Sequence, residues 1–242
     1  MIKRMVLMAS MVAMMAPLFA AETASVWKGE TELGFLVTSG NTETEKYSAR
    51  VKVENERDKW RHLAELKSLM SKETDVATDV TTTSAKKYEL TAKSDYKFRV
   101  LDYVFAVANY EDDRFSGYDY RASLAAGYGR RVLHQENLKL DIEAGPGVRK
   151  SRTDAGVDDN QGMLRLSGKL AWIISKTAKF NQELTSELGT DVNITRSISS
   201  LRNQINGDLS SVLTITVKNV SSVPVGVEET DTETALALVY SF

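Results

Sequence analysis

The chain of 242 residues contains no cysteine, two histidines and three prolines. Without cysteine it has no disulfide framework and no thiol chemistry, and a lipoprotein anchor, which requires a cysteine, is excluded. The scarcity of proline suits a continuous sheet, because each proline removes a ladder hydrogen bond. The formal net charge of −2 gives no long-range attraction to nucleic acid, so no nucleic-acid partner is expected.

Long apolar runs are missing after residue 18, so no transmembrane helix is expected there. The one long run, residues 5–18, follows Lys3 and Arg4 and precedes the small residues Ala20 and Ala21. A positive start, a short apolar core and small residues are typical of a cleaved secretory signal. We expect residues 1–20 to be a signal peptide and residues 21–242 to form one exported domain.

The last eleven residues, 232–242 (TETALALVYSF), alternate with a period of two. Leu236, Leu238, Tyr240 and Phe242 share one face, and small or polar residues fill most of the other. A lipid-facing row that ends on a terminal aromatic is typical of the closing strand of an outer-membrane barrel. We expect these four residues to resemble the signal that the barrel-assembly machinery reads.

Similar alternation recurs along the chain, with turn residues between the segments. It predicts strands within residues 27–37, 46–54, 60–70, 87–98, 103–110, 120–128, 138–149, 164–174, 179–188, 201–209, 212–220 and 232–242. We therefore predict an all-β fold, an antiparallel transmembrane β-barrel of about twelve strands, located in the cell outer membrane. An exported soluble β-barrel binding protein remains an alternative, because the alternation shows which residues share a face of a strand but not whether that face points into the barrel or out of it.

Aromatic residues and link lengths favour the membrane barrel. Aromatic side chains fall near both ends of the predicted strands, as in the two girdles of such barrels. Those expected near the periplasmic ends are Trp27, Trp60, Phe98, Tyr103, Tyr128, Trp172, Phe180 and Tyr240, and those near the other ends are Phe35, Tyr47, Tyr88, Tyr110 and Tyr120. The predicted links alternate between short ones, near residues 57–59, 99–102, 176–178 and 210–211, and longer polar ones, at residues 72–85, 111–119, 150–161, 191–197 and 224–231. Short periplasmic turns and longer outer loops have this asymmetry. The acidic groups of the longer links either attract cations that bridge lipopolysaccharide or simply keep the loops solvated.

The first predicted turn carries a short motif, TSGNTET at residues 38–44, after a strand with glycines at 29 and 34. With this motif the chain resembles the salt-induced outer-membrane protein family, a bacterial family of unknown function. The resemblance implies an integral outer-membrane barrel without catalysis, linked to salt or osmotic stress. For Ser39, Gly40, Asn41 and Thr42 a turn role is favoured over a ligand site, because Gly and Asn tolerate positive φ.

Candidates for catalysis are few. His62 falls on the apolar row of its strand, and Ser68 on the same face is ~20 Å away at strand rise. His134 falls in a predicted turn, and no histidine–carboxylate spacing indicates a metal site. No catalytic, metal or cofactor site is therefore expected, and a lipid-modifying outer-membrane enzyme with a cross-strand partner for His62 stays as an alternative.

The charged rows are expected to line the lumen, where opposite charges pair across strands. The candidate lumen charges are Arg50, Lys52, Glu54, Glu65, Lys67, Glu89, Lys93, Asp95, Asp141 and Glu143. Twelve strands lie between small filled barrels and wide porins, so a structural barrel and a narrow channel both remain open. The near balance of the two signs argues against strong ion selectivity. Expected partners are outer-membrane lipid, lipopolysaccharide and the assembly machinery; the oligomeric state is not determined.

Overall fold

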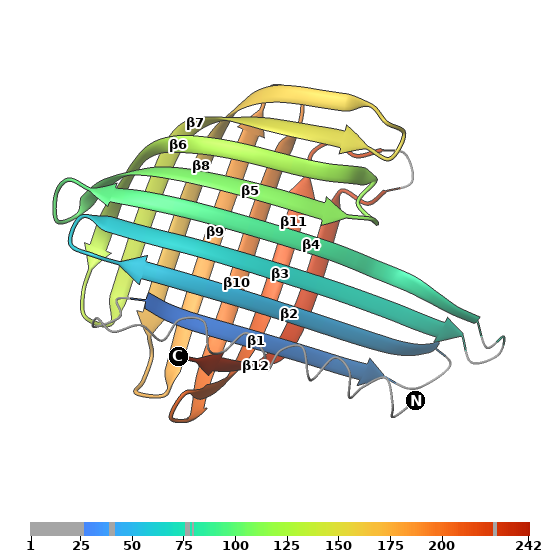
Figure 1. The fold of residues 1–242 in the computed structure, drawn as a ribbon, viewed down its shortest axis with the longest axis horizontal. Coiled ribbons are helices and arrows are strands. Elements are labelled where there is room, and N and C mark those ends of the chain that lie inside the picture. The colour runs from blue at the N-terminus through green and yellow to red at the C-terminus, as the bar shows by residue number, and fades with distance from the viewer. Residues whose placement is uncertain (1–26, 39–41, 76–77, 79, 225–226) are drawn as a thin grey trace.

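The computed structural model describes residues 27–38, 42–75, 78, 80–224 and 227–242. They form one closed antiparallel barrel in which each strand pairs with its neighbours in sequence and β1 pairs with β12 (Figure 1). The strands are β1 (Trp27–Thr38), β2 (Thr42–Glu56), β3 (Trp60–Asp75), β4 (Val80–Lys97), β5 (Asp102–Asp113), β6 (Tyr118–His134), β7 (Leu138–Thr153), β8 (Asp158–Ile173), β9 (Ala178–Gly189), β10 (Asn193–Asn206), β11 (Leu209–Val220) and β12 (Thr230–Ser241). The predicted fold is confirmed. Among these residues no helix is long and apolar enough to cross a membrane.

The predicted signal peptide, residues 1–20, and the turn residues Ser39, Gly40 and Asn41 lie outside the described residues. Of the four turn residues 39–42 only the backbone of Thr42 is described, as the first residue of β2.

Closure depends on the two ends of the barrel chain. Glu30 to Gly34 of β1 lie opposite Ser241 to Ala237 of β12. Beyond this ladder, Gly29 and Phe242 exchange backbone hydrogen bonds of 2.8 and 2.9 Å. The terminal residue therefore takes part in the seam that removes the free sheet edges.

The apolar rows point outward. Leu66, Leu236 and Leu238 expose 52%, 66% and 53% of their surface, whereas Val239 on the opposite face of β12 exposes none. A water-soluble barrel would turn its apolar rows inward, so this exterior is that of a membrane-spanning barrel. Figure 1 shows β2–β5 crossing over β9–β11 behind them, so that the two halves of the wall face each other across the lumen.

The aromatic prediction is wrong for one residue. Tyr103, expected in the periplasmic girdle, points into the lumen and is 4% exposed. Its ring lies over Gly129, where a Cβ would be 2.3 Å from a ring carbon, and its hydroxyl donates to Glu143 at 2.9 Å. Residues 103–108 of β5 are apolar on both faces, so the sequence did not show which of the two faces points into the lumen. The exposed aromatic residues near the short-link end are Trp27, Trp60, Phe98, Tyr128, Trp172, Tyr240 and Phe242.

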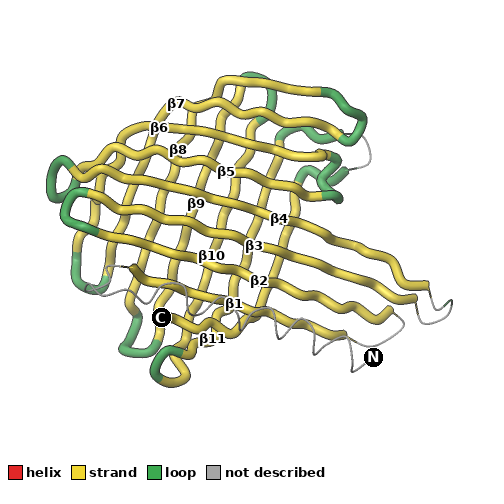
Figure 2. Tube along the Cα trace, in the orientation of Figure 1, coloured by secondary structure: helices red, strands yellow, loops and turns green. Residues whose placement is uncertain are grey.

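The links differ from the prediction at the end of the barrel opposite Trp27 and Phe242. Most residues of the expected longer loops belong to strands, which leaves links at 114–117, 154–157 and 190–192, and a longer one at 221–229 (Figure 2). Thr74 pairs with Thr81 and Glu73 with Thr82, so the ladder continues where both faces are polar. Above the membrane both faces meet water, and apolar alternation therefore ends before the strand does.

One turn was also misplaced. β10 and β11 are joined at Gly207 and Asp208 rather than near residues 210–211. Gly207 has a φ of +37°, which suits glycine, and Leu209 opens β11 instead of ending β10.

Candidate functional site

The lumen holds a cavity of about 540 Å³, lined by side chains from all twelve strands. Seven of the ten candidate lumen charges line it: Arg50, Lys52, Glu65, Lys67, Glu89, Lys93 and Glu143. Glu54, Asp95 and Asp141 do not line it but form ion pairs with inward-facing Lys52, Lys93 and Arg61.

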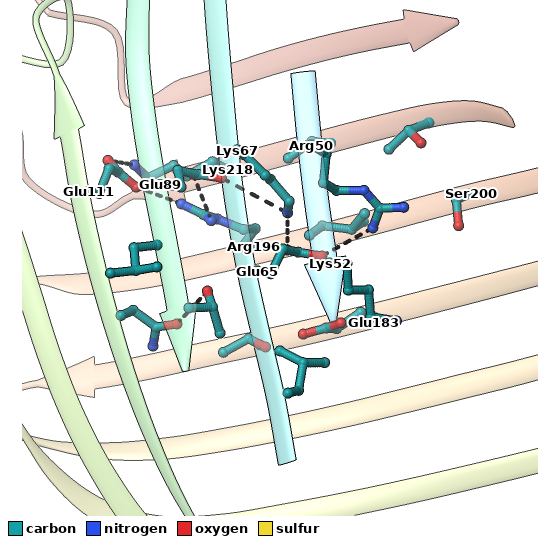
Figure 3. A pocket seen from close by; sticks show the side chains of 18 of the residues that line it. Arg50, Lys52, Glu65, Lys67, Glu89, Glu111, Glu183, Arg196, Ser200 and Lys218 are labelled. Carbon is teal, nitrogen blue, oxygen red and sulfur yellow. Dashed lines mark hydrogen bonds and ion pairs between the residues drawn. The ribbon is translucent and has the colours of Figure 1, made fainter. Parts of the chain in front are cut away.

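One ion cluster crosses the lumen (Figure 3). Arg196 of β10 lies 2.6 Å from Glu111 of β5 and 2.9 Å from Glu89 of β4. Lys218 of β11 also pairs with Glu111, and Arg121 of β6 lies 3.5 Å from it. In the closed strand order β5 and β11 are six strands apart in both directions, as are β4 and β10. These contacts therefore join opposite walls and narrow the lumen, and we call the five residues the bridging cluster.

A second cluster follows one wall nearer the short links. Asp95 accepts from Arg61 at 2.6 Å, and Arg61 lies 3.6 Å from Asp141. Glu143 pairs with Lys93 and accepts from Arg165 at 3.3 Å. The cations also lie over rings: Arg61 is 5.1 Å from the Tyr103 centroid, and Arg165 is 5.8 Å from that of Phe105. This wall is thus filled by paired charges and aromatic side chains.

A third cluster joins the first strands. Arg50 lies 2.8 Å from Glu32, 3.1 Å from Glu65 and 3.7 Å from Glu30. Arg202 of β10 reaches Glu30 at 2.8 Å and links this wall to the far side of the seam. The clusters satisfy charges that would otherwise be costly to bury.

Two cavity-lining lysines, Lys169 of β8 and Lys179 of β9, are exposed and form no ion pair with any residue that the structure describes. Glu183 and Glu233, which also line the cavity, are likewise without an ion-pair partner in the described chain. These four side chains are available to solutes.

Sequence reasoning missed much of the bridging cluster. Glu111 was assigned to an acidic outer loop, but it lies in β5 with its side chain only 12% exposed. Arg121, Arg196 and Lys218 were not among the candidates. The sequence signal that could have found two of them is the polar residue two positions away on the same face, Asn109 for Glu111 and Ser123 for Arg121.

The other acidic residues of the predicted loops lie mainly at strand ends, for example Glu73 in β3 and Asp158 in β8. No group of three or more possible metal ligands occurs among the residues with described positions.

His62 has a different partner from the one considered. Its Nδ1 lies 2.8 Å from Oγ of Ser94 on the neighbouring strand β4, and its ring stacks on Trp60 at 5.5 Å. His62 and Ser94 line a recess of about 320 Å³ that includes Ala64, Ala92 and other small residues of β3–β5. No carboxylate contact to His62 exists within the described residues.

Comparisons with known proteins place this architecture among outer-membrane barrels. The NanC porin has a TM-score of 0.53 at 12% identity, over 88% of this chain and 98% of the porin. An outer membrane channel from Pseudomonas putida F1 has a TM-score of 0.51 at 11% identity, over 93% and 98%. At these identities the likeness concerns the fold.

A relative in sequence is the Escherichia coli (strain K12) protein described as "Uncharacterized protein YdiY". It is 29% identical over 222 residues, which are 91% of this chain and 85% of the relative. A family model matches residues 31–242, nearly the whole barrel. With its twelve-stranded barrel and charged lumen, the chain belongs to the family described as "Protein of unknown function, DUF481".

Proposed function

We propose that the protein is a narrow channel of the outer membrane that passes small hydrophilic solutes and catalyses no reaction. The observation that carries this proposal is the cavity of about 540 Å³, which every strand lines and in which nearly half of the lining residues are charged. A purely structural barrel of this size is expected to fill its interior with packed side chains. Exposed Lys169 and Lys179 instead indicate water beside the lumen wall.

The bridging cluster sets the width of the proposed channel. Arg196 and Lys218 meet Glu111 from the opposite wall, so a solute passes only beside these side chains or when they separate. Long side chains around a small passage restrict it to small solutes. We therefore expect a conductance well below that of a 16-stranded porin.

The proposal includes export by residues 1–20, assembly through the terminal Leu236, Leu238, Tyr240 and Phe242, and contact with lipid and lipopolysaccharide. The resemblance to salt-induced proteins adds a role in salt or osmotic stress. The charged lumen supports such a role physically, because added salt weakens attraction between partly hydrated ion pairs.

The decisive experiment is conductance of the refolded chain in planar bilayers. Discrete current steps support the channel. A barrel that inserts, resists denaturation as a folded species and gives no steps is a structural barrel, and this outcome rejects the proposal.

A second candidate function is lipid acyl transfer at Ser94. The 2.8 Å contact between His62 Nδ1 and Ser94 Oγ on the outward face places a base beside a hydroxyl. Against it, His62 has no orienting carboxylate among the described residues, and strand amides are committed to the ladder rather than to an oxyanion hole. Release of fatty acid from phospholipid vesicles by the wild type, lost in Ser94→Ala and retained in the control Thr91→Ala, would establish it.

A further inference from the structure

The charges that line the cavity are not balanced. Thirteen lysine and arginine side chains and nine glutamates line it, although the whole chain carries a net charge of −2. This differs from the near balance expected from sequence. Arg196, Arg202 and Lys218 join the lining, whereas Glu54, Asp95 and Asp141 do not reach it.

Half of the excess of four positive charges lies where the bridging cluster crosses the lumen. Glu111 is shared by three cations, Arg121, Arg196 and Lys218. Glu89 is shared by Arg196 and Lys87, at 2.9 and 3.1 Å. Four cations thus surround two carboxylates. Ion pairs that share a carboxylate leave a positive potential at the constriction.

Lys169 and Lys179 add positive charge nearer the short links. In the sheet Lys179 lies directly opposite Arg202, another inward cation, and Lys169 lies opposite Glu183 without an ion pair. A solute that enters from that end meets the two free lysines before the bridging cluster.

From this distribution we propose that the lumen selects small anions, such as inorganic phosphate and short carboxylates, over cations of similar size. The inference rests on the proposed channel and names its substrate class. The positive lining lowers the electrostatic free energy of partly dehydrated anions in the lumen, and it repels cations at the bridging cluster.

The first test is the reversal potential of the refolded protein in a potassium chloride gradient. We expect chloride to permeate faster than potassium by roughly threefold to tenfold, since an unbalanced charge a few ångströms from an ion in a watery pore gives a preference of this order. The variant Lys169→Glu/Lys179→Glu leaves eleven charges of each sign on the lining and should abolish the preference. The control Lys59→Glu/Lys176→Glu makes the same change at exposed residues of short links outside the lining and should retain it.

A second test does not need a current. The chain has no cysteine, so Ser200→Cys places a single thiol on the cavity wall, and Thr177→Cys places one in an exposed link. Each is reacted with a sulfonate-bearing and a trimethylammonium-bearing methanethiosulfonate. The ratio of the labelling rate with the anionic reagent to that with the cationic reagent should be several-fold higher at Ser200→Cys than at Thr177→Cys. Adding Lys169→Glu/Lys179→Glu should remove this difference between the two ratios.

The outcomes separate the two proposals. Current steps without anion preference, together with equal labelling ratios at the two cysteines, reject the inference and leave the channel. Preferential anionic labelling without any current rejects the channel and retains an anion-attracting cavity. Failure of both reagents to reach Ser200→Cys in the folded barrel rejects both.

Discussion

Arg196 on β10 and Glu111 on β5 meet at 2.6 Å although they belong to opposite walls of the barrel. This contact, with the neighbouring pair of Arg196 and Glu89 at 2.9 Å, bridges the lumen at one level. It links the stability of the barrel to the width of its passage.

Removal of Arg196 should widen the passage. Arg196→Ala leaves Glu111 with Lys218 and Arg121 but removes the long side chain between the walls. We expect a single-channel conductance higher by about twofold or more, because a pore-lining constriction governs the passage. Arg202→Ala, which removes a pair with Glu30 beside the seam, is the control with the same change and a smaller effect. Equal conductance of the wild type and Arg196→Ala would show that the bridge does not limit flow.

Salt should open the wild-type lumen. The screening length falls from about 10 Å at 0.1 M to about 3 Å at 1 M, so the partly hydrated ion pairs of Arg196 weaken. Conductance measured against potassium chloride concentration should rise more steeply than bulk conductivity, and Arg196→Ala should follow bulk conductivity more closely. A strictly proportional rise in the wild type would contradict a salt-sensitive constriction.

Leu66 reports which face meets lipid. Its side chain is 52% exposed on the outer wall, so Leu66→Arg should reduce the stability of the inserted barrel by about 2–4 kcal/mol if it lies near the bilayer centre. Thr214→Arg places the same side chain on the cavity wall and should have a smaller effect. Urea titration of both variants in vesicles measures the difference, and the reverse ranking would mean that the rows are inverted.

Gly127 allows β6 and β7 to approach closely. An added Cβ would lie 2.2 Å from the Ala144 carbonyl oxygen and 2.5 Å from the Gly145 Cα, both backbone atoms that cannot rotate away. Gly127→Ala should therefore lower the free energy of unfolding by about 1–3 kcal/mol. Gly168→Ala, at a position with no atom within 4 Å of the added Cβ, is the matched control. The same denaturant midpoint for both variants would refute the packing argument.

Gly29 and Phe242 test the seam. A Cβ on Gly29 would lie 2.3 Å from the Phe242 ring, so Gly29→Ala must displace that ring and should slow closure. In a double-mutant cycle, Phe242→Ala should cancel most of the added cost of Gly29→Ala. The rate of barrel closure is measured without the assembly machinery, by refolding each variant into vesicles and following the heat-modifiable mobility of the folded barrel in electrophoresis. Additive effects would show that the two residues do not interact.

Strand number and the faces of most strands were predictable, because the period of two reports side-chain direction wherever one face is apolar. Residues 232–242 illustrate this: Leu236 and Leu238 lie outside, and Val239 inside. The prediction was wrong for Tyr103, where both faces of the strand are apolar. It also stopped too early at the long hairpins, where both faces are polar and the hydrogen-bonded ladder continues without an apolar row.

By itself, then, the sequence determined an all-β chain with about twelve strands and, for most of them, which residues share a face, since alternation is local. Only the tertiary structure decided that the apolar rows face outward and that Glu111 meets Arg196 and Lys218. These residues are 85 and 107 positions apart in the chain. Their contact depends on the stagger of all the strands around the closed barrel, a property that no single strand carries.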